Sequence, residues 1–180
     1  MYQLLAYSFI RKPCSPDIHD SIYGSLFLPD YSTLTAAYPG DSGHGGAYSE
    51  PDLTTEIAGN RRVDTRQATT DAVRLSFALN KMYGHNIPKS HSTNSIIGRN
   101  TKVYIYQLAG LKSYLTEKYG EPVTVASMAE LTGKSGIAMM EVPLVDGSEG
   151  SVGLWDGSKM HQISDHSRRA KKVYFWEADG

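Results

Sequence analysis

The chain has a single cysteine, Cys14, among its 180 residues, and this scarcity excludes an internal disulfide framework and any zinc site built from several cysteines. An excess of charge of one sign is also missing, because 18 Lys and Arg residues stand against 19 Asp and Glu residues. Proteins that bind nucleic acid carry a basic face and a high pI, so we expect no nucleic-acid partner. The fold must therefore be held together by its hydrophobic core.

Long apolar runs are absent as well. No window approaches the roughly 18 apolar residues that a membrane span needs. The apolar stretch over residues 1–10 is followed, not preceded, by the basic pair Arg11 and Lys12, and no small-residue cleavage site follows it. We therefore expect a chain that is made in the cytoplasm without a signal peptide and that has no membrane span.

The composition fits one globular domain spanning residues 1–180, with 40% apolar and 21% charged residues. Residues 1–65 are rich in proline and glycine, and they predict long loops with short strands over residues 3–9 and 25–28. Residues 66–180 show regular hydrophobic patterns and are expected to form the ordered core of the domain.

Two helices are predicted in this core. Ala72, Leu75 and Leu79 fall at helical spacing behind a threonine pair suited to a helix start, which predicts a helix of about 13 residues. A second helix is predicted from about Leu108 to Gly120. Shorter apolar runs then end at Asp-Gly turns and predict antiparallel strands over residues 136–142, 151–155 and 173–176. Helices first and a sheet afterwards is the order of an α+β fold.

The histidines suggest one place for acid–base or metal chemistry. His161 and His166 stand close together in the sequence, with Asp165 between them, but their spacing matches no standard zinc site. A solvated loop is the other interpretation of this segment. We therefore expect no cofactor and no bound metal.

Four stretches, in register, resemble one known family. They cover residues 70–80, 102–115, 133–138 and 150–157, within roughly Thr65 to Asp165. Together they resemble the fourth family of type VI secretion amidase effectors, which belongs with the papain-like NlpC/P60 peptidases. The resemblance implies an α+β, papain-like NlpC/P60 core with N-terminal helices packed on an antiparallel sheet. It also implies a toxin of bacterial competition that cuts the γ-D-glutamyl–diaminopimelate bond of peptidoglycan through a thioester.

The residues at the family's catalytic positions differ from the family's pattern. The family carries a cysteine at the start of the first helix, a histidine just before a Val-x-Leu-Trp strand, and a third polar residue farther along. At these positions this sequence has Asp71, Ser151 and, approximately, Gln162. A carboxylate cannot form the usual thioester, and serine does not accept a proton near neutral pH. The resemblance therefore implies an amidase scaffold without its thiol–imidazole pair, and no catalytic residue is assigned.

Two classes of function follow. The first is a pseudo-amidase effector, delivered by type VI secretion to a target-cell periplasm, that binds a peptidoglycan fragment or a protein in its former catalytic cleft and has a cognate immunity protein. The expected binding residues are Asp71, Arg74, Ser151, Trp155 and His161. The second is an enzyme with relocated chemistry, in which Asp71 acts with His161, Asp165 or His166, with or without a metal. Structural roles are the alternative for Asp71 as a first-turn residue and for Trp155 as a core residue.

Overall fold

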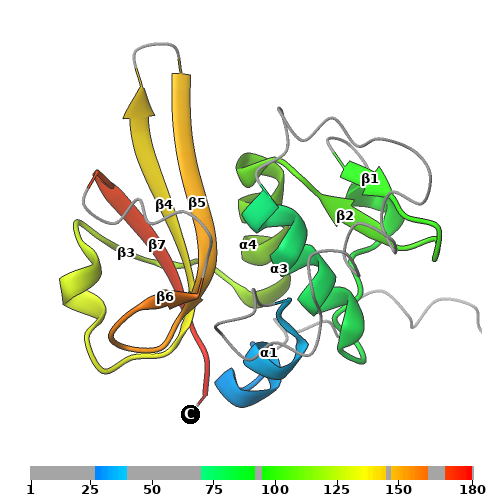
Figure 1. Ribbon diagram of the computed structural model, residues 1–180, viewed down its shortest axis with the longest axis horizontal. Helices are drawn as coiled ribbons and strands as arrows, with labels where there is room; N and C mark the ends of the chain where they lie inside the picture. The colour runs from blue at the N-terminus through cyan, green and yellow to red at the C-terminus, as the bar shows by residue number, and fades with distance from the viewer. Residues whose placement is uncertain (1–26, 40–69, 92–94, 145–146, 162–168, 180) are drawn as a thin grey trace, which may run out of the picture.

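The computed structural model describes residues 27–39, 70–91, 95–144, 147–161 and 169–179 (Figure 1). The helices in this part of the chain are α1 (Tyr31–Ala37), α3 (Thr70–Lys81) and α4 (Leu108–Tyr119), with short 3₁₀ helices η1 (Lys89–His91) and η2 (Met128–Leu131). The strands are β1 (Ser95–Ile97), β2 (Val103–Ile105), β3 (Val123–Val125), β4 (Gly136–Leu144), β5 (Gly147–Trp155), β6 (Met160–His161) and β7 (Lys172–Glu177). This order confirms the α+β prediction.

Five of these strands form one antiparallel sheet in the order β3-β7-β4-β5-β6. β4 is central, because it pairs with β5 on one side and with β7 on the other. A β-carbon at Gly136 would lie 2.1 Å from the carbonyl oxygen of Trp176, so only glycine allows β4 and β7 to approach this closely. The three predicted strands are confirmed as β4, β5 and β7, and each is longer than predicted.

Both predicted helices are present as α3 and α4. α4 ends at Gly120, whose φ of 89° is costly for other residues and whose N–H donates to the carbonyl of Thr116. α3 is the central helix of the fold, since every residue from Asp71 to Asn80 is buried. It packs against α1, α4, the sheet and the β1–β2 hairpin. No helix among the described residues is long and apolar enough to cross a membrane.

α1 is a helix that the sequence analysis did not predict. It occupies the space between Pro29 and Pro39, and the carboxylate of Asp30 caps it by accepting the N–H of Thr33 at 2.8 Å. Our prediction of loops and short strands throughout residues 1–65 is therefore wrong here, and residues 27–28 form no strand. The prolines were interpreted only as breakers, whereas seven helical residues fit between them. The strand predicted over residues 3–9 lies outside the described residues.

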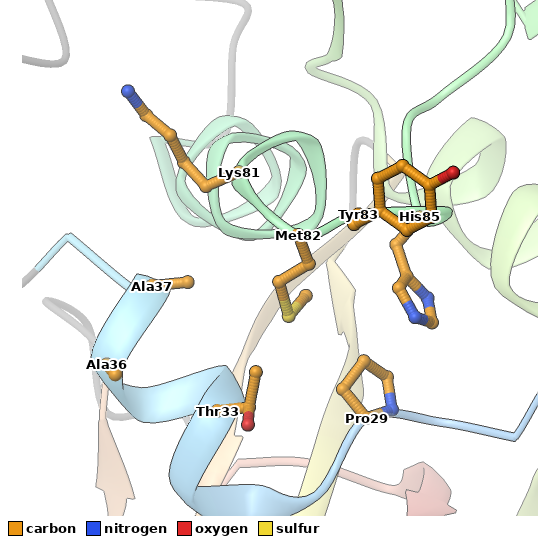
Figure 2. Close-up of a pocket in the computed structure, with 8 residues that line it drawn as sticks. All are labelled: Pro29, Thr33, Ala36, Ala37, Lys81, Met82, Tyr83 and His85. Carbon is orange, nitrogen blue, oxygen red and sulfur yellow. The ribbon is translucent and has the colours of Figure 1, made fainter.

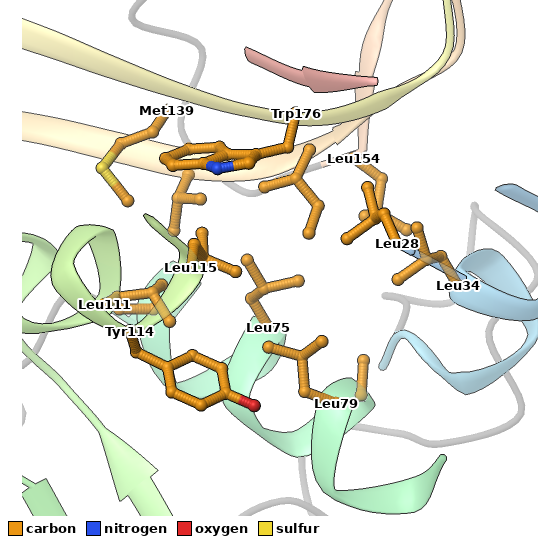
Figure 3. Close-up of a cluster of buried hydrophobic side chains, with 14 of the residues drawn as sticks. Leu28, Leu34, Leu75, Leu79, Leu111, Tyr114, Leu115, Met139, Leu154 and Trp176 are labelled. Carbon is orange, nitrogen blue, oxygen red and sulfur yellow. The ribbon is translucent and has the colours of Figure 1, made fainter. Parts of the chain in front are cut away.

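The main core lies between the helices and one face of the sheet (Figure 3). Leucines of α1, α3 and α4 meet side chains from β4, β5 and β7 there, and burying each one contributes about 1.5–3 kcal/mol. Figure 1 shows the chain's C-terminal end beside α1, where the N–H of Tyr31 donates to the carbonyl of Asp179 at 3.0 Å. The principal members of this core are Leu34, Leu75, Leu79, Leu111, Leu115, Leu154 and Trp176.

The opposite face of the sheet packs against η2 in a smaller cluster that includes Met140, Trp155 and Phe175. Successive residues of a strand point to opposite faces of the sheet. Membership of one cluster or the other therefore shows on which face each side chain of β5 lies. Val152 and Leu154 face the helices, and Trp155 faces η2.

Candidate functional site

The start of α3 carries Asp71 in its first turn, where the partial positive charge of the helix end favours an anion. Its side chain is almost fully buried, with 4% of the residue exposed. Ala72 and Leu75, which follow it, belong to the main core and hold this end of the helix in place. The local sequence therefore places a carboxylate inside the protein at a helix N-terminus.

The segment that follows α1 contacts α3 close to this carboxylate. One turn along α3, the buried guanidinium of Arg74 donates from Nη1 to the carbonyl of Pro39 at 2.9 Å. Burial raises the pKa of Tyr38 well above its ordinary value, the charge of Asp71 raises it further, and Arg74 partly offsets both effects. Tyr38, Asp71 and Arg74 thus form one buried polar group, which we call the α3 polar cluster.

Ser151 lies on β5 and is completely buried. It pairs with Met140 on β4, and paired residues of antiparallel strands share a face. Met140 belongs to the cluster on the η2 side, so Ser151 points to the face opposite α3. Its hydroxyl has no hydrogen-bond partner among the described residues. The side chain of Ser151 therefore points away from α3, and the structure does not bring it toward Asp71 as the sequence analysis expected.

Trp155 and His161 have separate surroundings. Trp155 is 7% exposed and its indole N–H donates to the carbonyl of Leu131 at 2.8 Å, which matches the structural role expected for a core residue. His161 lies on β6, and its Nε2 is 3.6 Å from a carboxylate oxygen of Asp156. The ring of Tyr31 meets the His161 ring edge-on, with the centroids 6.3 Å apart.

His161, Asp156 and Tyr31 form a second group, in which the pKa values of Asp156 and Tyr31 are shifted. Burial alone would raise the pKa of Asp156, but hydrogen bonds from Ser158 and from the backbone of Lys159, together with His161, lower it to about 2. Burial, followed by the charge of Asp156, raises the pKa of Tyr31 to about 12. At neutral pH the carboxylate is therefore charged and the phenol is protonated, which is an arrangement that can orient an imidazole.

The remaining expected site residues, Gln162, Asp165 and His166, lie outside the described residues, as does Cys14. Within the described ranges, no three or more His, Cys, Asp or Glu side chains come close enough to hold a metal ion. Sequence reasoning missed Tyr38 and Pro39, which are separated from Arg74 by more than thirty residues. It also missed Asp156, which was interpreted only as a turn residue.

A pocket of about 450 Å³ lies between α1 and the C-terminal end of α3 (Figure 2). Figure 2 shows Met82 pointing between the two helices and His85 pointing toward Pro29. We call it the α1–α3 pocket. Its lining residues are Pro29, Thr33, Ala36, Ala37, Lys81, Met82, Tyr83 and His85.

Residues 67–176 match the family model of Tae4, the amidase effector protein 4 of the type VI secretion system. The match covers more than half of the chain and includes α3, α4 and the five-stranded sheet except the last residue of β7. The chain belongs to the Tae4 family. Members of this family are amidase effectors of type VI secretion. Asp71, Arg74, Ser151, Trp155 and His161 all fall inside the matched residues.

Solved Tae4 structures share the fold. A Tae4–Tai4 effector–immunity structure from Salmonella typhimurium has a TM-score of 0.62 at 20% identity and covers 84% of this chain and 99% of that chain. Another such complex from Salmonella Typhimurium has a TM-score of 0.61 at 19% identity, with the same coverage. Tae4 from Enterobacter cloacae has a TM-score of 0.54 at 23% identity and covers 62% of this chain and 73% of that chain. No curated protein sequence matches the chain.

Proposed function

We propose that this Tae4-family protein is a pseudo-amidase: an effector that has lost peptidoglycan hydrolysis and acts by binding a cell-wall fragment or a protein partner in its former catalytic cleft. The observation that carries the proposal is Asp71, a buried carboxylate in the first turn of α3. We align the nucleophilic cysteine of the amidases with this position, on the sequence motif that begins α3.

The physical environment of Asp71 supports this interpretation. A helix N-terminus stabilises a thiolate through its dipole and its free N–H groups, and it stabilises a carboxylate in the same way. The site therefore keeps the electrostatic conditions for an anion, while the side chain present cannot form a thioester. Catalysis would also need a base, and the hydroxyl of Ser151 cannot replace an imidazole near neutral pH.

The burial of Asp71 and its neighbours gives further support. Tyr38 is 4% exposed, and Arg74 holds the backbone of Pro39 by a hydrogen bond of 2.9 Å. A nucleophile must meet its substrate directly, whereas Tyr38, Asp71 and Arg74 are all buried. A role in holding this end of the cleft in shape suits these buried groups better than attack on a peptide bond.

The proposal extends to fold ancestry, delivery and partners. We assign the core to the papain-like NlpC/P60 peptidases and the place of action to a target-cell periplasm. The Tae4 proteins of Salmonella typhimurium and Enterobacter cloacae are solved in complex with the immunity protein Tai4. By analogy, we propose a cognate immunity protein for this effector.

The test is hydrolysis of purified peptidoglycan by the full chain. We expect no new amino groups above the buffer blank, while a Tae4 relative that carries the cysteine–histidine pair releases them in the same assay. Binding is followed separately, by co-sedimentation with peptidoglycan sacculi, with the exposed Glu121→Ala variant as a control for surface charge. Cleavage by the wild-type chain that is lost in Asp71→Ala would refute the proposal.

A second candidate function rests on the contact between His161 and Asp156. Their 3.6 Å separation on a partly exposed surface is an acid–base arrangement, and it favours relocated chemistry on the same scaffold over an entirely passive surface. In the form considered from the sequence, Asp71 would act with His161, Asp165 or His166, with or without a metal. Metal analysis of the purified chain, and loss of any hydrolase activity in His161→Ala, separate this candidate from the pseudo-amidase.

A further inference from the structure

Two lysine side chains converge on the ring of Tyr174, apart from the residues considered so far. Nζ of Lys112, on α4, lies 3.4 Å from the ring centre, and Nζ of Lys172, on β7, lies 5.0 Å from it. Both distances are those of a cation–π contact, in which the negative face of an aromatic ring attracts a cation. Tyr174 is only 5% exposed, so its ring is a fixed support for the two ammonium groups. We call Lys112 and Lys172 the lysine pair.

The fold brings both lysines to this ring. Tyr174 belongs to the main core and therefore lies on the face of the sheet that meets the helices. Lys172 lies two residues before it in β7, so its side chain is on the same face. α4 crosses this face beside β5, since a β-carbon at Gly150 would lie 2.8 Å from Cδ1 of Leu108. Lys112 follows Leu108 by four residues, on the same side of the helix, and therefore points to the sheet as well.

One carboxylate belongs to the same surface. Glu141 on β4 pairs with Lys172 in the sheet, and its Oε1 accepts the hydroxyl proton of Tyr174 at 3.1 Å. Within the described chain neither lysine of the pair makes an ion pair or a hydrogen bond through its ammonium group, although each ammonium has three N–H donors. Two ammonium groups against one carboxylate leave one positive charge unbalanced.

These charges favour an anion of low charge as the ligand. The two ammonium groups repel each other, because both are held within 5.0 Å of the same ring centre. An anion between them replaces this repulsion by attraction and supplies acceptors for their N–H groups. The attraction grows in proportion to the charge of the ligand, whereas the cost of removing the ligand from water grows with the square of that charge. With Glu141 beside the pair, a singly charged carboxylate therefore suits the surface better than a dianion.

We propose that the lysine pair is a binding site for a ligand with a free carboxylate, which bridges the ammonium groups of Lys112 and Lys172 while the ring of Tyr174 holds them in place. The site uses no residue of the α3 polar cluster, and it does not depend on whether the chain hydrolyses peptidoglycan. Its failure and that of the pseudo-amidase proposal are therefore distinguishable, because one is measured by carboxylate binding and the other by hydrolysis.

The test is an NMR titration of the isotope-labelled full chain with N-acetylalanine, which has a carboxylate as its single charge. We expect shifts of the side-chain signals of Lys112, Lys172 and Tyr174, with a dissociation constant on the order of 10 mM. Lys112→Met and Lys172→Met remove one charge each but keep most of the aliphatic stem, and each should weaken binding about threefold or more. The matched control is Lys171→Met, because Lys171 is exposed next to the pair and has no contact with the Tyr174 ring in the described chain. It should bind like the wild type.

Further arms test the role of charge. Glu141→Gln keeps an oxygen that accepts the Tyr174 hydroxyl but removes the negative charge, so it should bind N-acetylalanine about twofold more tightly or better. The neutral N-acetylalanine methylamide should cause no shifts, and sulfate at matched ionic strength should bind more weakly than N-acetylalanine.

Four results would overturn the proposal. They are equal shifts with the methylamide, tighter binding of sulfate, wild-type affinity in either variant of the lysine pair or in Glu141→Gln, and a loss in Lys171→Met as large as in Lys172→Met. The last result would mean that the overall charge of the surface attracts the ligand, without a defined site.

Discussion

Replacing Asn80 by alanine should destabilise the protein by about 3 kcal/mol. Asn80 is 2% exposed near the end of α3, where its Nδ2 donates to the carbonyl of Val103 at 2.7 Å and its Oδ1 accepts the N–H of Ile87 at 3.0 Å. Asn80→Ala leaves both backbone groups without a partner in places that water barely reaches. Each unpaired buried group costs about 1–3 kcal/mol, and partial relaxation favours the lower half of the sum.

The measurement is urea unfolding followed by the fluorescence of the two tryptophans, Trp155 and Trp176, which are both buried. A loss of about 3 kcal/mol corresponds to a midpoint lower by about 1.5 M urea for a chain of this size. The matched control is Asn86→Ala, because Asn86 is exposed in the same segment and should change stability by less than about 0.5 kcal/mol. A loss below about 1 kcal/mol in Asn80→Ala would refute the reasoning.

Two further predictions concern the candidate sites. In a Cys14→Ser background, the thiol of Asp71→Cys should react with iodoacetamide at least roughly tenfold more slowly than that of Ser113→Cys, because residue 71 is 4% exposed and Ser113 is exposed on α4. Equal rates would mean that residue 71 is accessible to the reagent in solution. Burial alone would raise the pKa of Asp156, but hydrogen bonds from Ser158 and from the backbone of Lys159 outweigh it and lower this pKa to about 2. The ionised carboxylate therefore stabilises the folded protein above the ordinary pKa of 3.8, and this stabilisation is lost as the pH falls through about 2. Urea unfolding at about pH 5 and about pH 2 should therefore show a smaller acid loss in Asp156→Asn than in the wild type, and an equal loss would contradict this linkage.

Elements with their own periodicity could be predicted from the sequence. Leu75 and Leu79 repeat at helical spacing, and the strands β4, β5 and β7 contain short apolar runs or alternating apolar residues, so local patterns were sufficient. β1 and β3 are three residues each and have no recognisable period. They form strands because β2 and β7 offer them partners, and that information lies elsewhere in the chain.

The candidate site, too, could be predicted from the sequence only in part. The place of Asp71 in a first helical turn follows from the residues around it, and α3 has it there. The contact between Arg74 and the carbonyl of Pro39 does not, because it joins segments 35 residues apart. The face of Ser151 depends on its register with Met140, which only the pairing of β4 and β5 fixes. Local sequence therefore locates functional positions along the chain but not the surroundings that decide their chemistry.

An anion at the start of α3 suits the helix whichever side chain carries it. A thiolate and the Asp71 carboxylate gain the same kind of stabilisation from the helix end. Ala72 and Leu75, which anchor this end of the helix in the main core, are apolar and take no part in that stabilisation. In this scaffold the electrostatic stabilisation of the helix start and the ability to form a thioester are therefore separable properties.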